Sequence, residues 1–176
     1  MDPQQPSYFL RTERLGFRRW CPSDLPLALK LWGDIDVTRL FGGPFSAKDV
    51  EARLAKEMAC LEEHGFQYWP LFLLENDDLA GVCGLRPYPS KAERILELGF
   101  HLRPIHWGKG LAFEAAQAVI KFARESLRVD GLFAGHHPEN VGSAKVLMKL
   151  GFELTHEELY PPTGRMHKCY LLRFSR

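Results

Sequence analysis

The segment of the chain with the clearest chemical potential is the run His106-Trp107-Gly108-Lys109-Gly110-Leu111-Ala112. An apolar strand pattern ends just before this run and a long helical pattern begins within it, and its glycines permit a tight turn between the two. Successive backbone N–H groups in such a turn, together with the positive end of the helix dipole, form a site for a phosphate or pyrophosphate. Many glycine-containing turns are only turns, so the segment needs support from the rest of the chain.

Two common nucleotide-binding motifs do not fit this turn. A Walker A loop requires Ser or Thr after Gly-Lys, whereas Lys109 is followed by Gly110. The dinucleotide fingerprint requires a third glycine, and Phe113 occupies that position. The pattern therefore favours an anion site of another kind.

Hydrophobic periodicity predicts the elements that position this turn. The predicted strands are 10–19, 67–74, 79–88, 95–104, 130–137, 153–160 and 168–174. The predicted helices are 25–32, 47–64, 111–124 and 141–150, with Ser46 at the start of the second and with Gly65 and Gly151 at helix ends. The turn joins the fourth strand to the third helix, and we expect the fifth strand to run parallel to the fourth.

Length and composition exclude several classes of protein. The 176 residues suit one domain, 1–176, of which we expect 1–9 to be a flexible N-terminal segment. Hydrophobic residues make up 45% and charged residues 26%, which excludes a disordered chain. Lys and Arg total 23 against 22 Asp and Glu, so no basic excess favours nucleic acid or an anionic membrane as a partner. Without a signal-peptide pattern or an 18-residue apolar run, we expect a cytoplasmic protein.

The cysteines indicate neither a disulfide framework nor a metal site. They lie far apart, form no CxxC pair and have no His at the spacing of zinc ligands. The four are Cys21, Cys60, Cys83 and Cys169. We expect idle thiols in a reducing compartment and no bound metal.

Three segments together resemble one family. They are RLGFRRWCPSDLPLALKLW at 14–32, ELGFHLRPIHWGKGLAFEAAQAVIKFA at 97–123 and HPENVGSAKVLMKLGF at 137–152. Their order and spacing, from Thr12 to Arg173, resemble the GCN5-related N-acetyltransferases (GNAT), in particular the branch of the RimJ and RimL ribosomal-protein acetyltransferases. The resemblance implies a mixed α/β fold with a mostly antiparallel sheet, splayed between its fourth and fifth strands and flanked by four helices. It also implies acetyl transfer from acetyl-coenzyme A (acetyl-CoA) to an amine.

The resemblance assigns cofactor contacts residue by residue. The family's pyrophosphate loop maps on Trp107, Gly108, Lys109, Gly110, Leu111 and Ala112, with Trp in the first position. The strand whose backbone pairs with the pantetheine arm maps on Phe100, His101 and Leu102. Asn140 matches a pantetheine-binding Asn, and it can equally be a plain helix cap. Ser143 matches a Ser that lies beside the thioester sulfur in some relatives, and otherwise it is a solvent-facing residue of the first helical turn.

Acetyl transfer to an amine requires a neutral nucleophile, so some group must take a proton. Glu97 lies on the strand beside the cofactor slot, and in several relatives a carboxylate near this position serves as the general base. Alternatively, Glu97 is only a charged residue on the surface of the sheet. His101 shares its strand face with Glu97 by the period of two. His136 and His137 are adjacent and point to opposite faces, so at most one of them can serve.

The acid that protonates the leaving thiolate is also open. Some relatives use a Tyr at the position that Leu147 occupies here, which leaves Ser143, water or a residue such as Tyr160. Cys83 lies in an apolar strand without a neighbouring His, so a cysteine acyl-enzyme is not expected. The reaction is then a direct attack in a ternary complex.

The acceptor amine is not specified by these motifs. A protein N-terminus, a small amine, an amino acid or an aminoglycoside would fit, and we expect 22–65 and the turn 161–164 to select among them. The protein is expected to be a monomer or homodimer. Two competing functions are a non-catalytic acyl-CoA-binding or regulatory module with the same fold and a nucleotide-binding enzyme.

Overall fold

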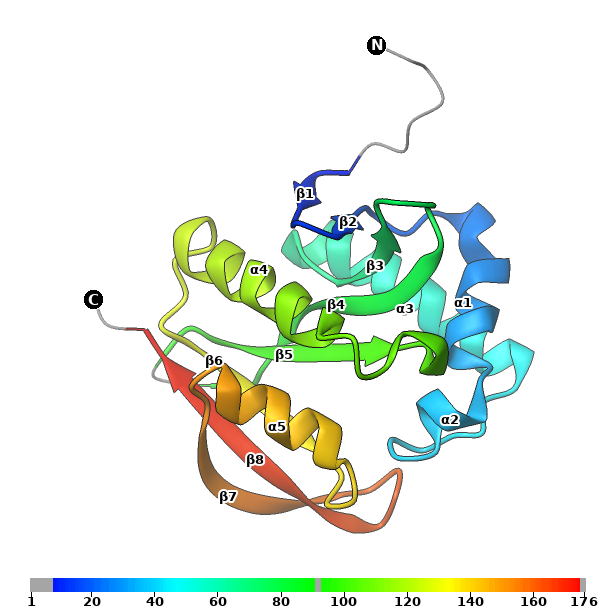
Figure 1. Cartoon of the computed structure of the whole chain (residues 1–176). Helices are drawn as coiled ribbons and strands as arrows, with labels where there is room; N and C mark the ends of the chain where they lie inside the picture. The colour runs from blue at the N-terminus through cyan, green and yellow to red at the C-terminus, as the bar shows by residue number, and fades with distance from the viewer. Residues whose placement is uncertain (1–7, 91–92, 175–176) are drawn as a thin grey trace.

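The structure is a computed structural model that describes residues 8–90 and 93–174. Eight strands form one sheet in the order β1-β2-β3-β4-β5-β6-β8-β7 (Figure 1). The strands are β1 Leu10–Arg11, β2 Leu15–Phe17, β3 Tyr68–Leu73, β4 Leu79–Pro87, β5 Ile95–Leu102, β6 Gly131–His136, β7 Glu153–Tyr160 and β8 Arg165–Arg173. The helices are α1 Leu25–Trp32, α2 Ile35–Thr38, α3 Ala47–His64, α4 Leu111–Glu125 and α5 Val141–Lys149.

Two elements differ from the sequence expectation. The first predicted strand is a pair of short strands, because the chain reverses at residues 12–14 and Leu10 pairs with Phe17. The one-turn helix α2 adds a fifth helix to the four expected, and Asp34 caps it by accepting a hydrogen bond from the Asp36 amide. Of the segment 1–9, residues 1–7 lie outside the described residues, while the Phe9 amide donates to the carbonyl of Phe17.

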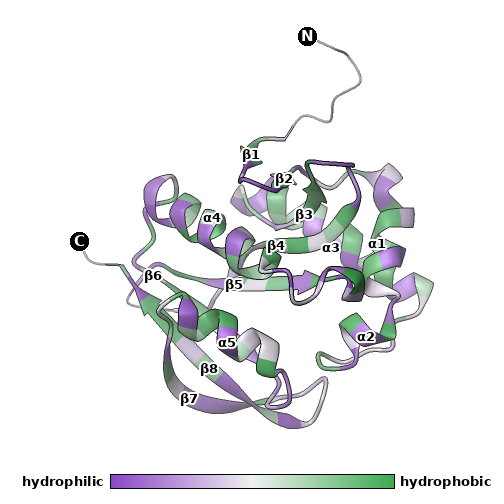
Figure 2. Cartoon of the chain, viewed as in Figure 1, coloured by the Kyte–Doolittle hydropathy of each residue, from purple (hydrophilic) through white to green (hydrophobic). Residues whose placement is uncertain are grey.

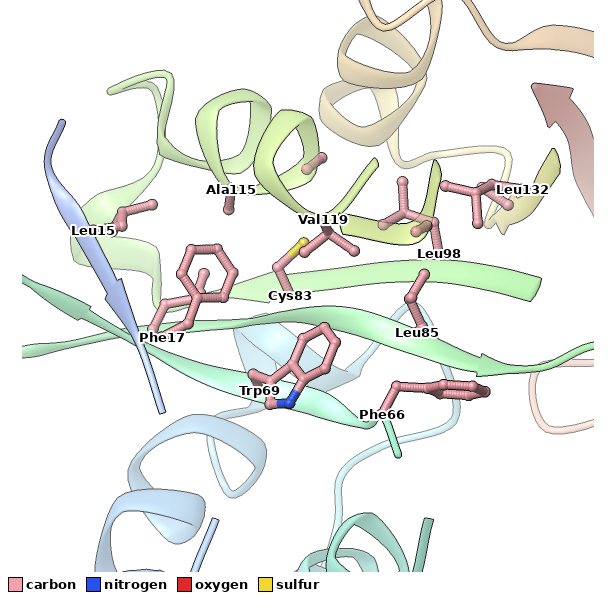
Figure 3. Packing of buried hydrophobic residues seen from close by; sticks show 14 of the residues in the cluster. Leu15, Phe17, Phe66, Trp69, Cys83, Leu85, Leu98, Ala115, Val119 and Leu132 are labelled. Atoms are coloured by element: carbon pink, nitrogen blue, oxygen red, sulfur yellow. The ribbon is translucent and has the colours of Figure 1, made fainter. Parts of the chain in front are cut away.

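The sheet separates two apolar layers. On one side, α4 and α5 pack over the strands, with Ala115 and Val119 of α4 above Cys83 and Leu98 (Figure 3). On the other side, α1 and α3 cover part of the sheet through a cluster that contains Trp32. The edge strand β7 is exposed along most of its length and mostly hydrophilic (Figure 2), which suits an edge that must not pair with another chain.

Alternation along β5 gives its two faces different characters. Leu96, Leu98 and Leu102 point into the layer under α4. Residues 95, 97, 99 and 101 point to the opposite side, which we name the Glu97 face. The strand registers extend this face to Tyr68 and Arg86 on one side and to Phe133 and Cys169 on the other.

The only parallel pair among the described strands is β5 with β6, and it is short. Its register joins Ile95 to Gly131, Leu96 to Leu132 and Glu97 to Phe133. Beyond Glu97 the two strands diverge, although β5 continues to Leu102 and β6 continues to His136. The expected splay between the fourth and fifth predicted strands is confirmed, because these strands are β5 and β6.

All four cysteines are free thiols, and Cys83 and Cys169 are buried. Among the described residues, no helix combines the length and apolar character needed to cross a membrane.

Candidate active site at the opening between β5 and β6

The predicted anion loop lies where β5 leads into α4. Gly108 and Gly110 have φ values of 73° and 77°, a left-handed conformation that favours glycine. Gly110 is also the N-cap residue of α4, so the first amides of the helix open toward the loop. A Cβ atom at Gly108 would meet no described atom within 4 Å, and one at Gly110 would meet only Arg14 Nη2 at 3.6 Å. The loop backbone is therefore accessible to a phosphate.

The loop is held in place by the start of the chain. Arg14 donates to the Lys109 carbonyl at 2.8 Å and forms a 2.6 Å ion pair with Glu114 in the first turn of α4. Thr12 Oγ1 donates to the same carboxylate at 2.5 Å. Trp107 Nε1 donates to the Leu102 carbonyl at 2.8 Å, which ties the loop to the end of β5. These contacts fix the glycine turn before any ligand arrives.

The open edge of β5 faces the gap that follows Glu97. Phe100, His101 and Leu102 pair with β4 through their other edge, in register with Cys83, Val82 and Gly81. Their free edge leads from Glu97 toward the loop at 106–112. The structure thus brings together the two segments that the sequence assigned to the pantetheine arm and the pyrophosphate.

The start of α5 carries the other two predicted contacts. Asn140 is the N-cap residue, and its Oδ1 accepts a hydrogen bond from the Ser143 amide at 3.0 Å. The plain capping role of Asn140 is confirmed. Ser143 Oγ has no hydrogen-bond partner among the described residues, and Leu147 is 1% exposed within the core. The Ser143 hydroxyl is therefore available to a ligand.

Glu97 marks the point where the sheet opens. Its Oε1 accepts a hydrogen bond from the Tyr68 hydroxyl at 3.4 Å. That hydroxyl lies directly on Gly99, where a Cβ atom would come within 2.0 Å of it, so only glycine permits this approach. Burial raises the pKa of the Glu97 carboxyl, and the nearby Arg86 and Tyr68 oppose the shift without cancelling it. A carboxylate in this state has more affinity for a proton than one in water.

A buried charge cluster supports the neighbourhood of Glu97. Glu57 is 1% exposed, forms an ion pair with Arg86, and accepts from the Tyr68 amide at 2.9 Å. Arg53 lies 3.8 Å from the same carboxylate, and its Nε is buried without a partner among the described residues. Arg86 also lies over the Tyr68 ring at 4.2 Å. The cluster places two guanidinium groups close to Glu97.

His101 does share the Glu97 face, as predicted, but its surroundings do not suit a base. Its ring stacks on Phe41 at 4.3 Å, and its Nδ1 accepts a hydrogen bond from Trp32 Nε1 at 3.4 Å. Burial lowers the pKa of His101 well below its ordinary value, and Arg53 and Arg86 lower it further. The imidazole is neutral and has little affinity for a proton.

His136, the last residue of β6, and His137, which follows it, point to opposite faces, as expected. His136 is buried against Tyr170, with its Nε2 3.1 Å from the tyrosine hydroxyl. His137 faces His167 edge-on at 5.4 Å. The His167 ring in turn stacks on Tyr160 at 4.4 Å. His137 and Tyr160 therefore belong to the Glu97 side of the sheet, and His136 does not.

A cleft of about 340 Å³ opens on this same side. Its walls come from the chain after α2, the start of the loop to α5, and the turn between β7 and β8. The lining residues are Arg39, Leu40, Gly42, Gly43, His137, Glu139, Pro162, Thr163 and Arg165. The regions 22–65 and 161–164, which the sequence suggested for substrate selection, therefore meet at one cleft.

Sequence reasoning missed the polar groups that surround Glu97. Tyr68, Arg86 and Glu57 are brought to it by pairing between β3, β4 and β5 and by the packing of α3. Glu57 and Arg53 have the i, i+4 spacing of an ordinary surface ion pair. The sequence around Arg53 and Glu57 gave no indication that both side chains would be buried.

Comparison with known proteins agrees with this geometry. The model of the Acetyltransferase (GNAT) domain matches residues 14–153. The chain belongs to the GNAT family of acetyltransferases. An uncharacterized N-acetyltransferase, p20 of Bacillus licheniformis, is 31% identical over 146 residues, which cover 82% of each chain.

Solved GNAT structures extend the likeness to the fold. An acetyltransferase from Agrobacterium tumefaciens str. C58 has a TM-score of 0.80 and 26% identity, covering 97% of this chain and 99% of its own. RimL, a ribosomal L7/L12 alpha-N-protein acetyltransferase in complex with coenzyme A, has a TM-score of 0.79 and 16% identity. That match covers 95% of this chain and 98% of RimL, and it shows a shared fold. The recognition of a GNAT protein with RimL-like relatives is confirmed.

The loop assignment predicts that Gly110→Val abolishes the rise in melting temperature that coenzyme A gives to the wild-type protein. A ligand bound only by the folded state stabilises it by mass action, and a valine side chain would stand where the backbone must approach phosphate. The matched control is Gly65→Val at the end of α3, since Gly65 has φ 80° and a Cβ atom there would meet no described atom within 4 Å. Both variants carry backbone strain of about 1–3 kcal/mol. A normal coenzyme A shift in folded Gly110→Val would contradict the assignment.

Proposed function

We propose that this GNAT protein transfers the acetyl group of acetyl-CoA to a primary amine, by direct attack within a ternary complex. One observation carries the proposal: the opening between β5 and β6 has the glycine loop at one end and a half-buried carboxylate, Glu97, at the other. The loop amides Trp107 to Ala112 bind the pyrophosphate, and the free edge at Phe100, His101 and Leu102 pairs with the pantetheine arm.

The reaction then needs only proton transfers from this chain. The amine nitrogen attacks the thioester carbonyl, the carbon–sulfur bond breaks, and the coenzyme A thiolate leaves. Glu97 takes the proton that the amine loses, directly or through water. The thiolate gains a proton from a hydroxyl or from water, so no covalent enzyme intermediate forms.

The environment of Glu97 supports its role as the base better than that of any neighbouring group. The pKa of Glu97 is raised toward neutral pH, which suits a general base. The pKa of His101 is lowered well below its ordinary value, so that imidazole is a poor base. The Tyr68 hydroxyl restrains the carboxylate at the mouth of the gap. Activity should therefore rise with pH through the ionisation of Glu97.

Two hydroxyl groups are candidates for protonating the thiolate. Ser143 lies in the first turn of α5, and its hydroxyl has no hydrogen-bond partner in the part of the chain that the structure describes. Tyr160 lies on the Glu97 side, and burial raises its pKa, which keeps it protonated at neutral pH. We assign the role to Ser143, because it matches the serine of the resemblance, and keep Tyr160 as the second candidate.

The cleft beside the turn 161–164 is the proposed entrance for the acceptor. Arg39 and Arg165 line it together with a single carboxylate, Glu139. This balance favours an amine whose neighbouring groups are neutral or acidic over a polycation. A protein N-terminus or a small amine would fit, and RimL acts on the alpha-amino group of a ribosomal protein.

The experiment that tests the proposal is an acceptor screen with thiol release as the readout. Peptide N-termini, amino acids and small amines are each supplied with acetyl-CoA. We expect amine-dependent release of coenzyme A for at least one class. Binding of coenzyme A without turnover by any amine would instead identify the non-catalytic module.

Replacement of Glu97 by Gln separates a base from a surface charge. We expect turnover to fall roughly a hundredfold, the usual scale for loss of a general base, with coenzyme A affinity unchanged. The remaining activity should climb with pH, because solvent then deprotonates the amine.

Stability gives an independent readout for the same variant. A raised folded-state pKa means that the protonated carboxyl favours folding at low pH and that this contribution is lost as pH rises through that pKa. Glu97→Gln should therefore melt no lower than the wild type at pH 8. Glu125→Gln, on the exposed end of α4, is the charge-loss control. Unchanged turnover in Glu97→Gln would exclude the assigned role.

Replacement of Ser143 by Ala tests the leaving-group assignment. Turnover should fall while acceptor KM changes little, and the melting temperature should hold because Asn140 caps α5 with its side chain. Asn140→Ala, in contrast, should lose about 1 kcal/mol of stability. If Ser143→Ala turns over normally and Tyr160→Phe does not, the acid is Tyr160.

A further inference from the structure

Three metal-binding side chains converge on the hairpin formed by β7 and β8. They are His156, Glu158 and Cys169, each of which can place one ligand atom within 4.8 Å of the other two. His156 lies directly opposite Cys169 in the strand register, and Glu158 follows on the same face of β7. His156 Nε2 lies 3.6 Å from Glu158 Oε2.

A β-bulge creates this convergence. The register joins Leu154 to Tyr170 and then His156 to Cys169, so Thr155 is the extra residue. Without the bulge, Thr155 would face Cys169 and His156 would point to the other side of the sheet. Bulges commonly re-aim a side chain in this way.

Thr155 also determines which imidazole nitrogen is free. Its hydroxyl donates its one hydrogen to the Cys169 carbonyl at 3.1 Å. The 2.9 Å contact with His156 Nδ1 must then be a bond that Thr155 Oγ1 accepts from Nδ1–H. In the neutral form of the ring, Nε2 then carries the lone pair, and it faces a carboxylate oxygen of Glu158 at 3.6 Å. Two acceptor atoms at this distance favour a cation between them, and an oriented histidine of this kind is typical of metal sites.

The donor set determines the class of metal. A thiolate, an imidazole nitrogen and a carboxylate oxygen suit Zn²⁺ and similar transition ions, whereas Mg²⁺ and Ca²⁺ prefer oxygen ligands alone. Cys169 is 1% exposed, while the His156 and Glu158 side chains are 49% and 53% exposed. The buried Cys169 sulfur lies at the bottom of the site. The fourth coordination position of the ion would face solvent and could hold a water molecule.

We propose that His156, Glu158 and Cys169, with Thr155 orienting the histidine, form a binding site for a Zn²⁺-class ion that links β7 to β8. Binding forms a metal–sulfur bond and releases the thiol proton of Cys169 to solvent. Cys169 packs with Phe133, the partner of Glu97 in the sheet, so the site lies on the Glu97 face, beyond Phe133. This departs from the sequence expectation of no metal, which considered only ligand spacing along the chain.

Titration with Co²⁺ tests the site without reference to activity. The chelator-treated full chain should bind one Co²⁺ with the charge-transfer absorption of a thiolate ligand, and Zn²⁺ should displace it. Excess Mg²⁺ should not compete.

Variants identify the ligands. Cys169→Ser should lose the charge-transfer band, and His156→Ala, at an exposed position, should keep the fold and lose tight binding. Thr155→Val should weaken Co²⁺ affinity about tenfold or more, the usual effect of removing an orienting group. The controls are Cys21→Ser and His64→Ala, because His64 lies at the end of α3 and pairs with Glu63 at a distance of 3.5 Å.

Three results would overturn the proposal. The first is the absence of a thiolate band in the wild-type protein, as expected if His156 is protonated and simply pairs with Glu158. The second is a band that survives in both His156→Ala and Cys169→Ser. The third is an unchanged Co²⁺ affinity in Thr155→Val, because Thr155 would then not orient the His156 ring for metal binding.

Discussion

The site depends on how far β5 and β6 stay paired. Three residue pairs hold these strands together, and the last one joins Glu97 to Phe133. Longer pairing would fill the edge of β5 with strand hydrogen bonds and leave no place for an extended ligand. Shorter pairing would separate the two halves of the sheet, because β8 and β7 are joined to the other strands through β6. The parallel contact is thus long enough to join the halves and short enough to leave an open edge.

The two sides of the opening have different electrostatics. On one side, a glycine turn and the start of α4 offer backbone amides, held by Arg14 and Glu114. On the other side, Glu57 compensates the charge of Arg86, and Glu97 is left with a raised pKa. A buried ion pair contributes little net stability. Its value here is that it positions Tyr68 and Arg86 beside a carboxylate that keeps its affinity for a proton.

Features encoded by neighbouring residues could be predicted from the sequence. The helix ends at Gly65 and Gly151, the cap at Asn140 and the parallel β5–β6 relation were all expected and are confirmed. The turn at 106–112 was located from its glycines and from the change from a strand pattern to a helical pattern around them. The one-turn helix α2 was missed because four residues carry no periodic signal.

Features that depend on strand register could not be predicted. The approach of Tyr68 to Glu97 requires a glycine two residues after Glu97 and the correct offset between β3 and β5. The meeting of His156 with Cys169 depends on a bulge at Thr155. A shift of one residue reverses every side chain of a strand, and composition does not reveal such a shift.

Residue-resolved hydrogen exchange of the backbone amides, with and without coenzyme A, tests the central claim most directly. The open edge of β5 should gain a partner when the pantetheine arm lies along it. The account predicts slower exchange within Leu98–Leu102 on binding, with little change at Ile95–Glu97, where β6 already pairs with the strand. Coenzyme A binding that slows exchange in the loop at 106–112 and leaves Leu98–Leu102 unchanged would contradict it.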